Sequence, residues 1–376
     1  MGAPLIFLSA GDPSGDNAAA RMLGELRRLR PDLQCYGLGG TRLQEQGQTQ
    51  LVDSARLAVL GFWEVARHFF FFRGLMKQCV RDISQRRPDV IVLVDYPGFN
   101  LRLAERVRKL KIPIVYYISP QVWAWGKGRL PQMKRLIDLM LYILPFEKGV
   151  FEAAGIPSRF VGHYLMEDIP QQYLATNPPA DGHLAVLPGS RPQEIQRHLR
   201  PMLTAARMFC RRNNAQATIA AVSGTFDYDS VLSAEDRQFI TITYDNPRRV
   251  IYDAAQVLTA SGTATLETAL IGRPMVVVYK TGWITYQIAR RLIDLKYIAL
   301  ANLIHGRSLV PELIQNQVTG GEIDRQLQAL ADDNKARQQM ITTLHQTPQL
   351  LGSVGASGNA AAAVAEYLPG GGATRC

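Results

Sequence analysis

The hydrophobic positions of this chain fall into short, nearly continuous apolar runs, and helical patterns separate most of them. Runs without polar alternation are typical of strands buried on both faces of a parallel sheet. They predict strands at residues 5–10, 34–38, 90–95, 112–118 and 138–144, and then at 184–187, 216–222, 239–243, 256–259 and 275–279. This βα alternation predicts an α/β protein with two doubly wound domains in tandem.

A change of composition separates the two series. Residues 170–182 contain three prolines and few apolar side chains, which marks a linker. We therefore expect an N-terminal domain at 1–169 and a C-terminal domain at 183–345. A C-terminal helix and frayed tail are expected at 346–376. Ligands are expected in a cleft between the carboxyl ends of the strands of the two domains.

Composition places the chain among soluble globular proteins, with 376 residues, 47% hydrophobic and 20% charged. No apolar run approaches the ~20 residues needed to cross a bilayer, and the N-terminus reads as a first strand and not as a secretory signal. Four cysteines without metal or disulfide spacing indicate a reduced, cytoplasmic setting. The net charge of +10 suits an anionic membrane or a phosphorylated substrate, and the motifs of nucleic-acid binding are absent from the sequence.

Two strand–loop–helix units in the second series predict an anion site. Residues 184–191 and 260–267 each pass from an apolar run into small residues and then a helical pattern, about 75 residues apart. Such units present backbone N–H groups and a positive helix end to an anion. The candidate ligands of a diphosphate are Gly189, Ser190, Arg191, Ser261, Gly262 and Thr263. A plain structural βα turn is the alternative for each loop.

The first series offers a loop and a carboxylate at strand ends. Residues 9–16 follow the first strand, so Gly11, Ser14, Gly15 and Asp16 are candidates for binding the acceptor, with a helix cap by Asp16 as the alternative. Asp95 ends a fully apolar strand beside a Pro-Gly turn. Partial burial there would raise its pKa toward a value useful for a general base. The alternative is a turn-forming aspartate bonded to nearby backbone.

Residues 61–78 predict a helix with more apolar surface than one stripe can bury. On a helical wheel one face holds Phe62, Val65, Phe69, Phe72 and Met76, whereas Trp63, Phe70, Phe71 and Leu75 point elsewhere among basic residues. This pattern is consistent with a membrane headgroup boundary or a lipid substrate, and equally with burial between domains or subunits. Trp123 and Trp125 likewise either shape a ligand cleft or fill a core.

Several motifs together resemble a known family. They lie at residues 11–16, 95–100, 119–125, 144–148, 187–191, 260–267, 274–280 and 302–307. In order and spacing this set resembles the lipid-A-disaccharide synthases, family 19 of the GT-B glycosyltransferases, from about residue 5 to about residue 330. The nearest alternatives are a muropeptide N-acetylglucosaminyltransferase or a UDP-N-acetylglucosamine 2-epimerase. A non-catalytic lipid- or nucleotide-binding module is the alternative from a different class.

The resemblance implies a GT-B fold of two Rossmann-like domains facing across a cleft, and an inverting transfer without metal or other cofactor. The expected substrates are UDP-2,3-diacylglucosamine and 2,3-diacylglucosamine 1-phosphate, and the products are the β-1,6-linked disaccharide 1-phosphate and UDP. It also implies a peripheral enzyme on the cytoplasmic face of the inner membrane of Gram-negative bacteria, bound to an anionic lipid surface.

Site residues follow from the same resemblance. Asp95 stands at the position of a catalytic aspartate and Arg191 at that of an essential arginine. The aromatic segment Phe69, Phe70, Phe71 and Phe72, with Trp63, corresponds to a patch thought to meet lipid. Asn302, Arg307 and Glu312 fall in a segment close to the nucleotide, in some members contributed by a partner subunit, so a homodimer is one expected assembly. We further expect Glu267 to bind the ribose hydroxyls. The chain departs from the family pattern at Asp12, Pro13 and Tyr164.

Overall fold

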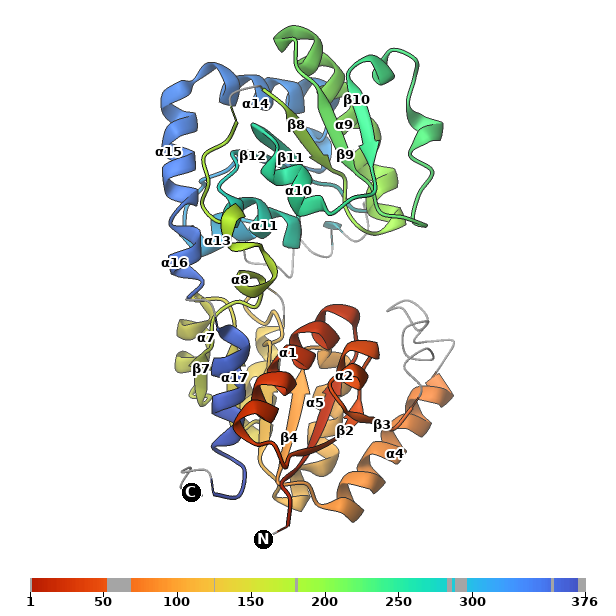
Figure 1. Cartoon of the computed structure of the whole chain (residues 1–376), viewed down its shortest axis with the longest axis vertical. Coiled ribbons are helices and arrows are strands. Elements are labelled where there is room, and N and C mark those ends of the chain that lie inside the picture. The colour runs from red at the N-terminus through yellow and green to blue at the C-terminus, as the bar shows by residue number, and fades with distance from the viewer. Residues whose placement is uncertain are drawn as a thin grey trace. The chain divides into compact units, whose positions relative to one another are not determined.

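The computed structural model describes residues 2–52, 69–124, 126–179, 182–282, 286–287, 296–352 and 355–370. The chain divides into two compact units, one formed by Met1–Tyr164 with Gly352–Cys376 and the other by Leu165–Leu351. Each unit is built on one parallel sheet with helices packed around it (Figure 1). The α/β class and the two Rossmann-like folds expected from the sequence are confirmed.

Within the described residues, the sheet of the first unit has seven parallel strands in the order β3-β2-β1-β4-β5-β6-β7. These are β1 (Leu5–Ala10), β2 (Gln34–Leu38), β3 (Thr49–Gln50), β4 (Val90–Val94), β5 (Ile114–Tyr117), β6 (Leu139–Tyr142) and β7 (Ser158–Phe160). The helices are α1 (Pro13–Leu29), α2 (Thr41–Glu45), α4 (Phe69–Arg86), α5 (Pro97–Val107), α6 (Leu130–Leu136), α7 (Glu147–Ala154) and α17 (Ala356–Ala365). All five residues of β4 are buried, as a strand covered on both faces requires.

The last helix returns to the first unit, where α17 lies beside α1 (Figure 1). Glu366 accepts from Arg159 at 2.6 Å, and Asn359 donates to the carbonyl of Val161 at 3.1 Å. Residues 346–376 were predicted as a separate C-terminal segment, whereas the second unit ends at Leu351 and the first unit resumes at Gly352. An alanine-rich helix has little contrast between faces, so its pattern does not indicate what it packs against.

Over the part of the second unit that is described, six parallel strands follow the order β10-β9-β8-β11-β12-β13. They are β8 (Leu184–Leu187), β9 (Ala217–Ala220), β10 (Ile240–Thr243), β11 (Gln256–Ala260), β12 (Met275–Tyr279) and β13 (Glu312–Ile314). The helices are α8 (Leu165–Asp168), α9 (Pro192–Asn213), α10 (Pro247–Tyr252), α11 (Thr263–Ile271), α13 (Leu300–His305), α14 (Gly320–Asp332), α15 (Asn334–Leu344) and α16 (Thr347–Leu350).

Both sheets share one topology. Numbered within its own unit, each begins 3-2-1-4-5-6, so the winding reverses between β1 and β4 in the first sheet and between β8 and β11 in the second. Ligands of open α/β sheets bind outside the carboxyl ends of the strands at this switch point. The loops after β1 and β4, and those after β8 and β11, are therefore the expected places for chemistry.

All ten predicted strands are present to within a few residues. The strands β3, β7 and β13 were not predicted. Each lies at an edge of its sheet and has only two or three residues, too few to show an apolar run.

Candidate functional site

Asp95 lies at the carboxyl end of β4, on a backbone held from several sides. Its N–H donates to the Tyr117 carbonyl at 3.0 Å, and its carbonyl accepts from Tyr116 Oη at 2.5 Å and from Asn100 Nδ2 at 2.8 Å. Asp95 and Tyr96 both adopt left-handed conformations, with φ of 44° and 47°. Two successive non-glycine residues in this region cost about 1–3 kcal/mol each, and such strain clusters at functional sites.

The environment of the Asp95 carboxyl suits a general base. Burial, and after it the neighbouring carboxylate of Asp12, raise the pKa of Asp95 to about 6, although a hydrogen bond from the Tyr96 backbone lowers it. The predicted rise in pKa is confirmed. A base with a pKa near the working pH combines ionisation with strength as a proton acceptor.

The loop after β1 places Asp12, and not Asp16, at the start of α1. The Oδ1 atom of Asp12 accepts from the Gly15 N–H at 2.6 Å and from Ser14 Oγ at 3.2 Å, which caps the helix. Gly11 lies against the Tyr96 ring, and a Cβ atom added at Gly11 would overlap that ring. A side chain at this position would therefore displace the ring beside Asp95.

Asp16 has a different role from either of those expected. Its carboxylate is buried and accepts from the N–H groups of Gly40 at 2.6 Å, Arg42 at 3.0 Å and Leu43 at 3.3 Å. It therefore satisfies the free donors at the start of α2, a helix distant in sequence. The alternative that Asp16 caps its own helix is wrong, because Asp12 fills that role.

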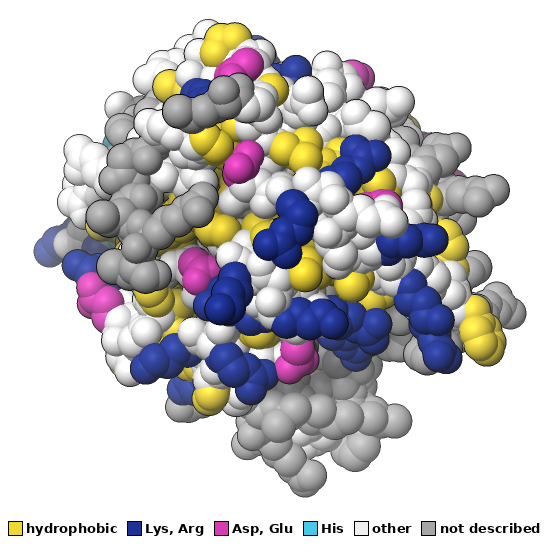
Figure 2. All heavy atoms as spheres, turned by 90° about the horizontal axis from the view of Figure 1, so that it is seen from below, with side chains coloured by type: hydrophobic (Ala, Val, Ile, Leu, Met, Phe, Trp, Pro, Cys, Tyr) yellow, Lys and Arg dark blue, Asp and Glu magenta, His cyan; other side chains and the backbone are white. Residues whose placement is uncertain are grey.

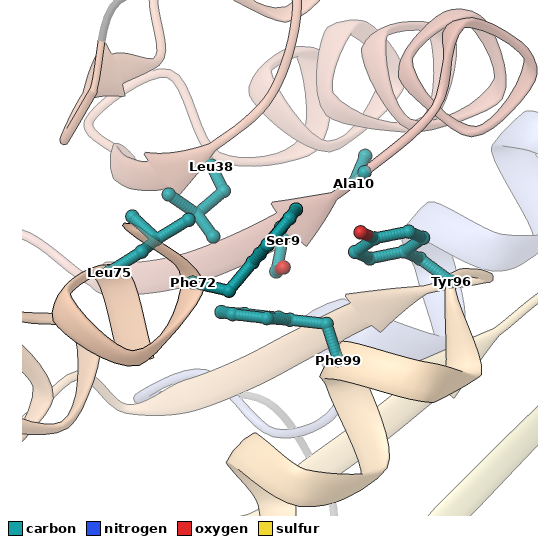
Figure 3. A pocket seen from close by; sticks show the side chains of 8 residues that line it. Ser9, Ala10, Leu38, Phe72, Leu75, Tyr96 and Phe99 are labelled. Carbon is teal, nitrogen blue, oxygen red and sulfur yellow. The ribbon is translucent and has the colours of Figure 1, made fainter. Parts of the chain in front are cut away.

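A small, largely apolar pocket opens beside the Asp95 loop (Figure 3). Its lining comes from the ends of β1 and β2, from α4 and from the start of α5, and consists of Ser9, Ala10, Gly11, Leu38, Phe72, Leu75, Tyr96 and Phe99. Phe72 and Leu75 reach in from α4, whereas Tyr96 and Phe99 line the opposite side (Figure 3). The rings of Tyr96 and Phe99 stack with centroids 6.1 Å apart. The pocket thus connects the aromatic helix with the neighbourhood of the carboxylate.

The helix α4 divides its aromatic residues between core and solvent. Phe70 is 82% exposed, whereas Phe71 and Phe72 are half-buried and Met76 is buried. Leu75 is also buried, so the expectation that it points away from the core is wrong. Trp63 lies outside the described residues, and of Phe69 only its place at the start of α4 is described.

Basic side chains follow Phe70 along the exposed face of α4. Arg73, Lys77 and Arg81 are exposed and recur every four residues, which places them on one side of the helix. Seen from below, Lys and Arg side chains gather across the surface with apolar side chains between them and few acidic ones (Figure 2). Within the described residues, no helix is both long and apolar enough to span a membrane.

A second buried carboxyl lies at the same edge of the first sheet. Glu147 accepts from Ser119 Oγ and from the Leu144 N–H, and so joins the loops after β5 and β6. Burial raises its pKa to about 7, although these hydrogen bonds lower it.

Trp123 is buried and packs edge-on against Phe146, so it fills the core; Trp125 lies outside the described residues.

In the second unit, the loop after β8 presents Arg191 to solvent. Arg191 is the N-cap residue of α9, its side chain is 78% exposed, and it donates to Glu194 at 2.7 Å. Gly189 has φ 117°, a conformation that favours glycine, and an added Cβ would lie 3.0 Å from Glu194. Ser190 is exposed. The guanidinium and the start of a long helix thus meet at the switch point.

The loop after β11 lies beside it in the sheet. Ser261 Oγ donates to the Ile298 carbonyl at 3.2 Å, whereas Gly262 and Thr263 are exposed at the start of α11. The first N–H groups of a helix have no acceptor within it and are available to an anion. The two anion loops predicted from the sequence therefore flank one switch point.

Glu267, on α11, is held by an arginine. Arg248 Nε donates to its Oε1 at 2.8 Å, and Arg248 Nη1 donates to the Asp168 carbonyl at 2.6 Å. The side chain of Glu267 is largely buried. This network fixes the direction of the carboxylate.

Asn302 and Glu312 are built into the interior. Asn302 donates to Glu312 Oε1 at 2.7 Å and to the Val310 carbonyl at 2.9 Å, and its own oxygen accepts from the N–H groups of Leu309 and Val310. Glu312 also accepts from the Ala299 N–H at 2.9 Å. Arg307 donates to Thr343 Oγ1 at 2.6 Å. All three side chains thus have partners within the second unit.

Asp12 was not predicted as a neighbour of the candidate base, because the spacing of residues in the sequence does not reveal charge coupling between two strand ends. Among the described residues, no group of three or more His, Cys, Asp and Glu is placed to hold a metal ion. Cys35, Cys79 and Cys210 are buried free thiols.

Comparisons with known proteins identify the family. The profile of the family described as lipid-A-disaccharide synthetase matches residues 6–364. The lipid-A-disaccharide synthase of Anaeromyxobacter dehalogenans strain 2CP-C is 39% identical over 360 residues, covering 93% of this chain and 94% of that protein. The synthase of Myxococcus xanthus is 36% identical and covers 98% of both.

Solved structures agree in fold. The glycotransferase of kitacinnamycin superposes with a TM-score of 0.67 at 14% identity, covering 98% of this chain and 100% of that one. A UDP-N-acetylglucosamine 2-epimerase from Listeria monocytogenes gives 0.63 at 11% identity, covering 98% and 97%. At such identities the likeness extends to the fold alone. The profile match and the relatives decide the family: this chain belongs to the lipid-A-disaccharide synthetases, glycosyltransferases with the GT-B fold.

Proposed function

We propose that the chain joins UDP-2,3-diacylglucosamine to 2,3-diacylglucosamine 1-phosphate with inversion, forming the β-1,6 disaccharide 1-phosphate and releasing UDP. The observation that supports this most is Asp95, a half-buried carboxylate on a strained backbone at the switch point of the first sheet, with a pKa raised to about 6. Asp95 takes the proton from the 6-hydroxyl of the acceptor as that oxygen attacks the anomeric carbon. Base catalysis of this kind typically contributes about 10²–10⁴ in rate.

The second unit holds the UDP of the donor. As the anomeric bond breaks, negative charge grows on the diphosphate, and Arg191 with the N-termini of α9 and α11 stabilises it. Gly189 and Ser190 on one side, and Ser261, Gly262 and Thr263 on the other, line its path. Arg191 exchanges its bond to Glu194 for the diphosphate. These groups stabilise the negative charge of the diphosphate without a metal ion, so chelation with EDTA should leave the rate of transfer unchanged.

Glu267 accepts hydrogen bonds from the ribose hydroxyls of the nucleotide. Its direction is set by Arg248, which occupies one oxygen and leaves the carboxylate further acceptor capacity. Asn302 and Glu312 act indirectly, because their polar atoms are already bonded, and they support the turn that carries Arg307 near the nucleotide. The homodimer expected for this segment is part of the proposal, and sedimentation velocity tests it.

Acyl chains and membrane meet the protein at α4. Phe70 is exposed, Phe71 and Phe72 are half-exposed, and a basic row follows them down the helix, a combination that suits an anionic membrane surface. The pocket that Phe72 and Leu75 line extends from this helix to Tyr96, the residue that follows Asp95. We place the protein at the cytoplasmic face of the inner membrane, with the helix at the lipid boundary.

Asp95→Asn tests the catalytic assignment. The purified variant, given both acylated sugars, should release UDP at about 10²–10⁴-fold lower kcat, because the amide cannot accept the proton. Asp89→Asn is the matched control, since Asp89 precedes the same strand at its opposite end and accepts from the Leu5 N–H at 2.9 Å. Near-normal turnover by Asp95→Asn would remove Asp95 from this role.

A further inference from the structure

His198, on α9, is a buried residue with both ring nitrogens engaged by backbone groups. It is 1% exposed, its Nδ1 lies 3.0 Å from the Pro188 carbonyl oxygen, and its Nε2 lies 2.9 Å from the Lys280 backbone nitrogen. A carbonyl only accepts and an N–H only donates, so these partners require a proton on Nδ1 and none on Nε2. The ring is therefore neutral and in one tautomer.

The two partners belong to different loops at the carboxyl edge of the second sheet. Pro188 follows β8 and precedes Gly189, and Lys280 follows β12. The strand β11 lies between β8 and β12 in the sheet, and it ends at the loop that begins with Ser261. His198 thus ties together the loops on either side of the start of α11.

We propose that His198 is a positioning residue for the donor nucleotide: it fixes the spacing between the loop that carries Gly189, Ser190 and Arg191 and the end of β12. This inference rests on the proposed placement of UDP at the second switch point. An anion bound by several backbone N–H groups needs them at fixed separations, and supporting hydrogen bonds set that geometry. A single side chain of α9, that of His198, bonds to both of these loops.

A histidine that only fills the core would affect stability and leave nucleotide affinity alone. If His198 positions the loops, its substitution weakens UDP binding even in variants whose folded state is as stable as that of the wild type. Substitution by Asn or Gln tests the two hydrogen bonds one at a time. In His198→Asn the amide lies near the position of Nδ1 and can donate to the Pro188 carbonyl. In His198→Gln the side-chain oxygen can reach the position of Nε2 and accept from the Lys280 N–H. Leu removes both bonds.

UDP affinity is measured by calorimetry for the wild type and for His198→Asn, His198→Gln and His198→Leu, with the donor and acceptor KM values alongside. We expect about tenfold weaker UDP binding for each hydrogen bond lost, so that Leu is the weakest, with donor KM raised and acceptor KM unchanged. His183→Gln is the control, since His183 bonds Thr218 at the amino end of the same sheet and should leave UDP affinity unchanged.

Two results overturn the inference: folded variants that bind UDP within about twofold of the wild type, or a wild-type imidazole carrying its proton on Nε2. The tautomer is read from ¹⁵N chemical shifts of the wild-type ring, which keeps the test decisive where a variant does not fold. Wild-type protein that binds no UDP at all would instead overturn the proposed function, so the two failures are distinguishable.

Discussion

The two sheets of this chain share one strand order and carry opposite chemistry at the switch point. The edge of the first sheet presents the carboxylates of Asp95 and Asp12 with a strained backbone and an apolar pocket. The edge of the second presents glycine turns, the starts of α9 and α11, and the exposed guanidinium of Arg191. The same strand order thus suits a proton acceptor in one unit and an anion in the other. The residues that follow the strands determine which of the two kinds of site a unit can form.

Burial separates the two edges further. In the first unit the carboxyl of Asp95, the candidate base, is partly withdrawn from water, and this raises its pKa. In the second unit Ser190, Arg191, Gly262 and Thr263 are exposed, whereas Gly189 and Ser261 are half-buried. Groups that bind a large charged ligand must be accessible to it. These differences support the proposal that the first unit activates the acceptor hydroxyl and the second holds the leaving UDP.

The largest effect on the anion side is expected from Arg191→Ala. Removing one donor to a growing negative charge lowers kcat by about 10²–10³, measured as UDP release at saturating substrates. Arg191→Lys should retain part of the rate, because it keeps the charge and loses the fork of donors. Arg200→Ala, exposed on the same helix, is the control and should be unaffected. Equal rates for Arg191→Ala and wild type would break the comparison.

A smaller effect is expected from the apolar side of the first unit. Replacing Phe70 with serine should lower the partition coefficient onto vesicles containing anionic lipid by about tenfold, since an exposed aromatic ring no longer inserts. Phe71→Ser, which is half-buried, should have a weaker effect. Leu29→Ser removes an exposed side chain from α1 and serves as the control. Unchanged vesicle binding by Phe70→Ser would sink the proposed membrane face.

The smallest effect concerns the coupling between Asp12 and Asp95. Asp95 acts in its ionised form, so kcat/KM falls as the pH drops through its pKa of about 6. Asp12→Asn removes a negative charge that disfavours ionisation, so the pKa of Asp95 falls and the acid limb of the profile moves to lower pH. The amide oxygen can still cap α1. An acid limb that moves upward, or stays in place, would contradict the coupling.

The sequence predicted more of the fold than of the site. Fully apolar strands such as β4 and β8 are recognised in the sequence as continuous apolar runs. The predicted ends of these two strands placed Asp95 and Arg191 at the switch points, where the structure has them. Partners that depend on tertiary packing were not predictable. Asp16 bonds a helix that begins 25 positions later, and the ring of His198 joins two loops separated by about 90 residues.

Helical wheels also have a limit that α4 shows. Leu75 lies three positions after Phe72, at the edge of the apolar stripe, and tertiary packing in the core of the first unit buries it. Asn302 and Glu312 show a similar limit for polar residues. A sequence motif does not indicate whether its side chains bind a ligand or hydrogen-bond to one another, as these two do.

The most direct test of this division of labour is UDP affinity, measured by calorimetry for the wild type, Asp95→Asn and Arg191→Ala. We expect Arg191→Ala to bind UDP at least about tenfold more weakly, because a charge-assisted contact is lost, and Asp95→Asn to stay within about twofold of the wild type. The reverse pattern, or equal losses in both variants, would contradict the assignment of base and anion site to separate units.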